Sequence, residues 1–216
     1  MTPSAREFFS GKTHLFIQQM KEWVEILTDF ETKNKYQVLS NQGEEVGYVA
    51  EAGSGLWRII CRLFFRSHRP LDIRVWNKSG EEILKIKRPF FWFFSSLTVY
   101  GTNGQPLGEV HRRFAFFTKK YSLINQTGNE FLTIKAGIFK IWTFPMYDDS
   151  GQEVGKISKE WGGLLKEVFT DADRFGVEFP DYVSEEEKAV VFATAISIDF
   201  DFFEDNAKQQ DDFGVG

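Results

Sequence analysis

Apolar and polar residues recur in the same order around five glycines. The glycines are Gly43, Gly80, Gly104, Gly128 and Gly151. The apolar positions stand five residues before each glycine and three and six residues after it: Val38, Val75, Val99, Leu123 and Met146; Val46, Ile83, Leu107, Phe131 and Val154; Val49, Ile86, Val110, Ile134 and Ile157. A small or polar residue opens each turn: Ser40, Asn77, Gly101, Asn125 and Asp148. A type I turn closed by a left-handed glycine has this form, so the pattern predicts one β-hairpin copied five times.

The spacing of the hairpins indicates how they connect. The last three glycine-to-glycine spacings are 24, 24 and 23 residues, which leaves no room for helical crossovers. We therefore expect an antiparallel sheet throughout. Two more strands are predicted at 164–169 and 174–179, on either side of the polar turn 170–173. The total is about twelve strands.

One helix is predicted after the strands, over about 184–203. Ser184 and Glu187 form a capping-box pattern, and the segment KAVVFATAISIDFDFF that follows is apolar on nearly every face. A helix of this kind must be buried. Since eight strands fill their own barrel and sixteen enclose a water channel, a twelve-stranded barrel has room for a helix.

The predicted fold is therefore mainly β: a closed antiparallel barrel of about twelve strands around a central, apolar C-terminal helix. The alternative is a two-sheet sandwich with the helix packed outside. We assign 1–13 to an N-terminal tail, 14–204 to the barrel with its helix, and 205–216 to a disordered acidic tail.

Composition narrows the functional classes. The 216 residues carry a net charge of −5 and include 24 phenylalanines and one cysteine, Cys61. The N-terminus lacks the pattern of a secretory signal, which favours a reducing, cytoplasmic setting. The longest apolar run near the C-terminus, 189–198, is half of the about 20 residues that a membrane-spanning helix needs. Phosphate-binding glycine loops, GxSxG elbows and HExxH pairs do not occur in the sequence, so we expect no enzymatic activity.

Positive charge is concentrated in the segments that join one hairpin to the next. These links span 53–70, 87–96, 111–120 and 135–143 and contain no acidic residue. Their cations are Arg58, Arg62, Arg66, Arg69, Lys87, Arg88, Arg112, Arg113, Lys119, Lys120, Lys135 and Lys140. In an up-and-down barrel all links lie at one end and all hairpin turns at the other, so one rim should be basic.

Aromatic residues interleave with these cations, a composition that suits the interface of an anionic membrane. We expect the lipid contacts at Trp57, Arg58, Arg62, Phe64, Phe65, Arg66, Arg88, Phe91, Trp92, Phe93, Phe94, Arg112 and Arg113. The alternative is that the aromatics fill one end of the core and the cations form a solvated rim. We do not expect nucleic acid as a partner, because the chain carries a net negative charge.

Several segments resemble the phospholipid scramblase family over about 15–204. They are LFIQQMKEWVEILTDFETKNKYQV (15–38), GKISKEWGGLLKEVFTDADRFGVEFP (155–180) and the ending IDFDFFE (198–204). The resemblance implies a tubby-like barrel around a C-terminal helix, and a protein associated with calcium-stimulated movement of phospholipids between leaflets. Where animal members carry a palmitoylated cysteine cluster, this chain has PFFWFF at 89–94, so the sequence does not support acyl anchoring.

The same resemblance implies a weak calcium site in 171–182. The candidate members are Asp171, Asp173, Phe175, Val177 and Asp181. Two aspartates spaced by one residue suit a hard cation, but a twelve-residue calcium loop would need a carboxylate at position twelve, where Tyr182 stands. The alternative is a plain Asx turn between two strands.

Together these features predict a cytoplasmic, peripherally membrane-associated protein that binds anionic phospholipid, with calcium-dependent scrambling as its expected activity. The alternative is a tubby-like module that binds lipid or protein without transport. The sequence does not identify a protein partner.

Overall fold

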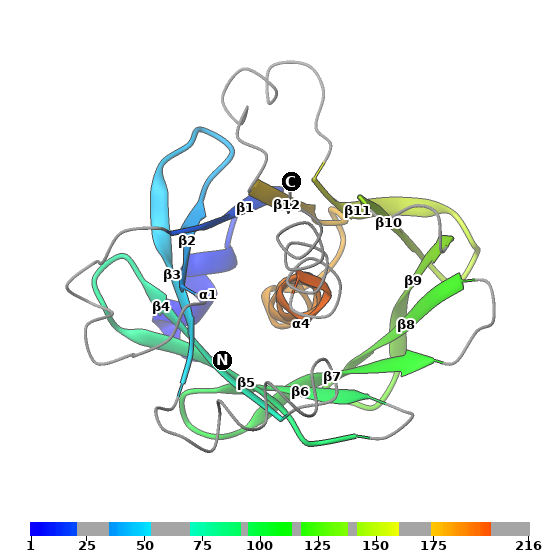
Figure 1. The fold of residues 1–216 in the computed structure, drawn as a ribbon, viewed down its shortest axis with the longest axis horizontal. Helices are drawn as coiled ribbons and strands as arrows, with labels where there is room; N and C mark the ends of the chain where they lie inside the picture. Colours follow the sequence, from blue (N-terminus) through cyan, green and yellow to red (C-terminus); the bar gives the residue numbers. More distant parts are fainter. Residues whose placement is uncertain are drawn as a thin grey trace, which may run out of the picture.

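The computed structural model describes residues 1–20, 35–52, 70–91, 95–113, 118–137, 142–159 and 174–199. Twelve described strands form one closed barrel in the order β1-β12-β11-β10-β9-β8-β7-β6-β5-β4-β3-β2 (Figure 1). The strands are β1 (His14–Gln19), β2 (Lys35–Leu39), β3 (Glu45–Glu51), β4 (Leu71–Asn77), β5 (Glu82–Arg88), β6 (Ser96–Gly101), β7 (Pro106–Arg113), β8 (Thr118–Asn125), β9 (Glu130–Gly137), β10 (Thr143–Tyr147), β11 (Glu153–Ser158) and β12 (Arg174–Glu178). Every pairing among them is antiparallel. The predicted barrel is therefore confirmed, and the sandwich alternative is wrong.

The five hairpins lie where the glycine pattern predicts them. Each glycine has a φ between 79° and 85°, a conformation that residues with a side chain adopt only under strain. Each also donates its amide hydrogen to the carbonyl of the residue three positions earlier, as Gly128 does to Asn125 over 3.0 Å. The strand register shifts by one residue beside every turn, as in a β-bulge.

The barrel contains one strand, β1, that the sequence pattern does not predict. The barrel closes through β1, which pairs with β12 on one side and β2 on the other. The strand predicted at 164–169 lies outside the described residues. No glycine turn marks β1 in the sequence, and its partner β12 is distant along the chain, so the local pattern does not identify it.

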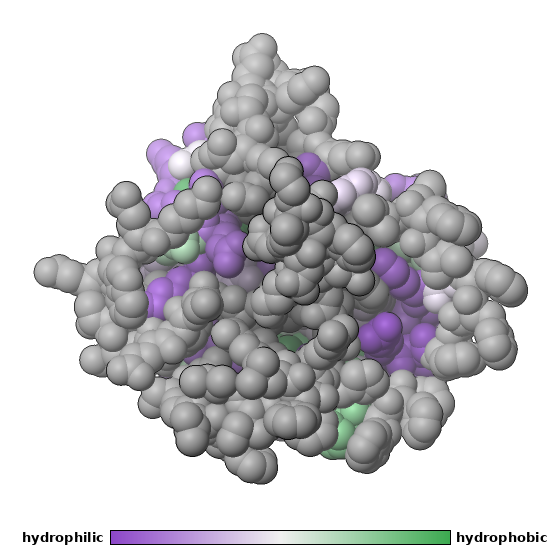
Figure 2. Space-filling model, in the orientation of Figure 1, coloured by the Kyte–Doolittle hydropathy of each residue, from purple (hydrophilic) through white to green (hydrophobic). Residues whose placement is uncertain are grey.

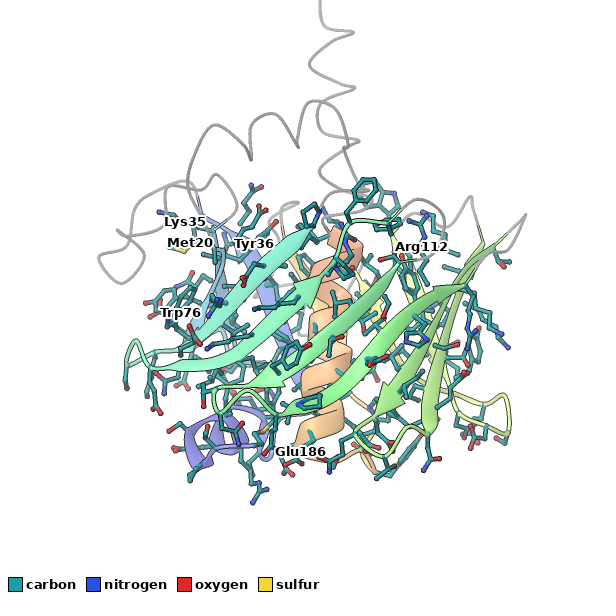
Figure 3. All side chains as sticks on the ribbon, turned by 90° about the horizontal axis from the view of Figure 1, so that it is seen from below. Met20, Lys35, Tyr36, Trp76, Arg112 and Glu186 are labelled. Carbon is teal, nitrogen blue, oxygen red and sulfur yellow. The ribbon has the colours of Figure 1, made fainter. Side chains whose placement is uncertain are left out.

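The helix α4 (Glu185–Ile198) runs along the barrel axis (Figures 1 and 3). Its capping box is complete: the Ser184 hydroxyl accepts from the Glu187 amide, and the Ser184 amide donates to the Glu187 carboxylate over 3.0 Å. All ten residues of 189–198 are buried, as a helix surrounded by strands requires. The part of the predicted helix beyond Asp199 lies outside the described residues.

A short helix, α1 (Pro3–Phe9), stands where the sequence predicts only a tail. Thr2 caps its first turn, and one face buries Ala5, Phe8 and Phe9. The ring of Phe9 lies 5.8 Å from that of Phe192 in α4, centroid to centroid. The helix forms because this apolar face packs against α4.

Candidate membrane interface

The barrel has two different ends, and α4 orients them. Glu186 marks the end where the helix begins and the five glycine turns lie, which we call the turn end. Arg112 and Tyr36 lie toward the opposite end, where successive hairpins are joined, which we call the link end (Figure 3). The Tyr36 hydroxyl donates to the buried Asp199 carboxylate over 2.7 Å, so a strand residue holds the residue that follows α4.

Four of the thirteen predicted lipid contacts are described: Arg88, Phe91, Arg112 and Arg113. The other nine lie outside the described residues: Trp57, Arg58, Arg62, Phe64, Phe65, Arg66, Trp92, Phe93 and Phe94. For those nine, lipid contact stays a prediction.

Arg88 and Phe91 are buried rather than presented to solvent. Their exposed fractions are 2% and 7%, and the Arg88 guanidinium carbon lies 5.1 Å from the centre of the Phe91 ring. In this structure the two side chains stabilise each other by a cation–π contact. At these two positions the packed-core alternative describes the structure better than lipid contact does.

Arg112 and Arg113 occupy opposite faces of β7. Arg112 stands directly opposite Tyr121, whose side chain is buried inside the barrel, so Arg112 also faces inward. Lys119 shares this inner face, with its ammonium 5.4 Å from the centre of the buried Phe144 ring. Burial and then the charge of Arg112 lower the pKa of Lys119. Arg113, the next residue along β7, is exposed on the outer face.

Two large apolar side chains at the link end are exposed among the described residues. Phe90 is 36% and Trp142 is 42% exposed. The Lys159 ammonium lies 5.6 Å from the centre of the Trp142 ring. Tryptophan is enriched at headgroup depth in membrane proteins. In Figure 2, hydrophilic residues make up most of the coloured surface, with only small hydrophobic areas between them.

The calcium candidates do not form one loop in the described residues. Phe175 and Val177 belong to β12, where both side chains are buried and the backbone pairs with β1. This regular strand is incompatible with a calcium-binding loop that continues through 174–178. Asp171 and Asp173 lie outside the described residues, and calcium binding there stays a prediction. The described residues contain no group of three or more metal-ligating side chains.

Asp181 lies on a separate groove of about 650 Å³ near the turn end. Three more carboxylates line this groove: Asp148, Glu153 and Glu178. The Lys156 ammonium forms an ion pair with Glu178 at 3.6 Å. Hydrogen bonds from Ser150 and from the Gln152 backbone lower the pKa of Asp148, whose carboxylate thereby holds its own turn.

Comparison with known proteins identifies the family. The sequence model of the Scramblase family matches residues 1–205. The chain belongs to the scramblase family.

Several proteins with assigned names align with this chain over most of its length. Human phospholipid scramblase 1 is 30% identical over 99% of this chain and 70% of its own length. Bovine phospholipid scramblase 2 is 30% identical over 94% of this chain and 72% of its own length. Human phospholipid scramblase family member 5 is 27% identical over 94% of this chain and 78% of its own length.

One solved structure has a fold similar to that of this chain. An X-ray structure of a protein from Arabidopsis thaliana superposes with a TM-score of 0.51, covering 90% of this chain and 96% of that one at 12% identity. At that identity the match supports the shared barrel fold alone. Within the described part of the chain, neither helix combines the length and hydropathy required to span a bilayer.

Proposed function

We propose that this chain is a peripheral membrane protein that binds anionic phospholipid through its link end and takes part in phospholipid scrambling. The observation that carries the proposal is the uneven distribution of charge in a chain of net charge −5. The links hold the cations and the exposed Trp142, whereas the turns are rich in acids such as Glu44 and Glu81. Each Lys or Arg near an anionic surface contributes about 1 kcal/mol to binding.

Family membership supports the scrambling half of the proposal, since several relatives are named phospholipid scramblases. Calcium is the proposed trigger, with Asp171 and Asp173 as its ligands. In reconstituted vesicles we expect calcium to accelerate leaflet exchange of a labelled lipid, and Asp171→Ala to remove that acceleration. Exchange that is equally fast with calcium and with a chelator would contradict the trigger.

Vesicle flotation tests the binding half. We expect the protein to float with phosphatidylcholine vesicles that contain phosphatidylserine and to remain behind with phosphatidylcholine alone. Raising the salt concentration should weaken the binding, because exposed charges separated by more than about 8–10 Å are screened in physiological salt. Equal flotation with both vesicle types, or with neither, would contradict the proposal.

A second candidate is a lipid-binding module that does not transport lipid. The burial of α4 favours it, because the helix occupies the lumen and is capped at Ser184 and hydrogen-bonded at Asp199. Flotation without any leaflet exchange would support this candidate, and exchange above the rate of protein-free vesicles would exclude it.

A further inference from the structure

Three cations form a row across the outside of three neighbouring strands. Arg113 on β7 stands directly opposite Lys120 on β8, and Lys120 stands directly opposite Lys135 on β9. Directly paired residues of antiparallel strands have Cα atoms about 5 Å apart. We call Arg113, Lys120 and Lys135 the cation row; it extends over roughly 10 Å.

All three side chains point away from the barrel lumen. Their neighbours Tyr121 and Ala136 are buried on the inner face, and successive side chains of a strand alternate between faces. Arg113 and Lys135 are exposed, and Lys120 is half-buried. Since the three residues lie in the link-end halves of their strands, the row belongs to the same end as Trp142.

The cation row lowers the stability of the folded protein, because like charges that stand directly opposite each other on paired strands repel. Elsewhere on the sheet two cations of neighbouring strands have acidic partners: Arg74 contacts Asp72 at 2.8 Å, and Lys85 contacts Glu82 at 3.3 Å. Among the described residues, no carboxylate forms an ion pair with any member of the cation row.

The cation row makes contacts with neutral groups, which do not neutralise its positive charge. The Arg113 Nε donates to the Ser122 hydroxyl over 3.2 Å, and the Lys135 ammonium lies 5.7 Å from the centre of the Tyr147 ring. One carboxylate, that of Glu130, interacts electrostatically with Lys120 and Arg113 without forming an ion pair with them among the described contacts. Burial acts to raise its pKa, but hydrogen bonds from Thr133 and Ser122, followed by the charges of Lys120 and Arg113, lower it overall.

The charge of the row defines the ligand that would compensate it. Three cations and Glu130 leave two positive charges, and a phosphate monoester carries about −1.5 to −2 at neutral pH. A phosphodiester with a single charge would leave part of the row uncompensated. The planar guanidinium of Arg113 can donate two parallel hydrogen bonds to phosphate oxygens, and the lysines add ammonium donors.

We propose that Arg113, Lys120 and Lys135 bind the phosphate monoester of a lipid headgroup at the membrane surface. This inference rests on the proposed function: the row lies at the same end of the barrel as the exposed Trp142, and docking of that end on a membrane brings a lipid headgroup rather than a free metabolite to it. Phosphatidic acid is the simplest lipid that carries such a group.

The experiment measures binding to two sets of vesicles of equal surface charge, one containing phosphatidic acid and one containing phosphatidylserine. We expect tighter binding to phosphatidic acid. Lys120→Gln with Lys135→Gln should weaken that binding by about five-fold for each lysine, hence roughly 25-fold together. The control, Lys78→Gln with Lys85→Gln, removes the same charge away from the row and should weaken binding less than two-fold. Lys120→Arg with Lys135→Arg keeps the charge and should retain binding.

A melting curve makes loss of fold distinguishable from loss of binding. Because neutralising the row relieves like-charge repulsion, the Lys120→Gln, Lys135→Gln protein should melt at the same temperature as the parent or higher. Inorganic phosphate at millimolar concentration should leave vesicle binding intact, whereas displacement by it would overturn the assignment to a lipid headgroup.

The outcomes separate this inference from the proposed function. If the parent binds both vesicle sets but the row variant and the control lose affinity equally, the cation row is not the site while membrane docking stands. Equal affinity for the two lipids also overturns the monoester assignment. If the parent binds neither set, the proposed function itself fails, and the inference with it.

Discussion

Gly108 is the point where the barrel wall and the central helix leave no space for a side chain. A Cβ built there would lie 2.4 Å from the Ile124 carbonyl oxygen and 2.6 Å from Cγ2 of Val190. The first of these atoms is backbone in the paired strand β8 and the second belongs to α4, so Gly108→Ala requires the strand or the helix to move. Overpacking of this kind costs about 1–3 kcal/mol.

Gly137→Ala is the matched control, because a Cβ at that position would have no neighbour within 4 Å. There the substitution reduces the entropy of the unfolded chain and should stabilise the protein by about 0.4–1 kcal/mol. The two variants should therefore differ by roughly 1.5–4 kcal/mol in free energy of unfolding. For a domain of this size each kcal/mol shifts the melting temperature by about 2–4 °C.

Equilibrium denaturation in urea measures both variants, with thermal melting as a second readout. A double-mutant cycle with Val190→Ala adds a test of the helix contact: because the Cγ2 atom is then gone, Gly108→Ala should cost less in that background. The reasoning is refuted if Gly108→Ala and Gly137→Ala have the same stability, or if the cost of Gly108→Ala is unchanged by Val190→Ala.

Three further changes test the ends of α4. Phe9→Ala, which empties a fully buried site against the helix, should cost about 3–5 kcal/mol in urea denaturation, whereas Phe90→Ala at an exposed position should cost much less; equal losses would show that α1 contributes no packing. Ser184→Ala removes the helix cap and should cost about 1 kcal/mol, with no loss counting against the capping box. Burial acts to raise the pKa of Glu186, but a backbone amide and Arg6 lower it overall, so its ionised form stabilises the fold. The Glu186→Gln protein should therefore be less stable than the parent at pH 7. Denaturation curves should show this difference in stability disappear as the pH falls below the ordinary carboxyl pKa of 4.5 and through the lowered pKa of Glu186. A difference in stability that persists at pH 2 would contradict the assignment.

The sequence predicts well those features that local chemistry determines. A turn that needs a left-handed residue shows its glycine, and a buried helix shows apolar residues on all faces, so both could be placed within a few residues. Closure of the barrel depends instead on the pairing of His14 with Glu178, two residues far apart in the chain. Neither residue has a local pattern that identifies the other, so the sequence does not predict the strand β1, while the strand predicted at 164–169 lies outside the described residues.

The candidate site was less predictable for a related reason. The links identify which end of the barrel is basic, but the face that each cation occupies depends on strand register. Arg112 and Arg113 are adjacent in sequence and stand on opposite sides of the wall, while Arg113 and Lys135 are distant in sequence and belong to one row. Burial of Arg88 likewise follows from its inward position on β5 rather than from its residue type.

The position of α4 constrains how the barrel could act on a membrane. Its five largest apolar side chains, Val190, Val191, Phe192, Ile196 and Ile198, are at most 1% exposed. Moving each side chain into water costs about 1.5–3 kcal/mol. The total for the five side chains is as large as the whole net stability of a typical domain, about 5–15 kcal/mol. The helix therefore remains inside the strands unless the bilayer itself receives those side chains. A bound barrel that keeps its helix has only its outer surface and its rim to offer to lipid. The link end carries both the cation row, which forms no ion pair among the described residues, and the exposed ring of Trp142.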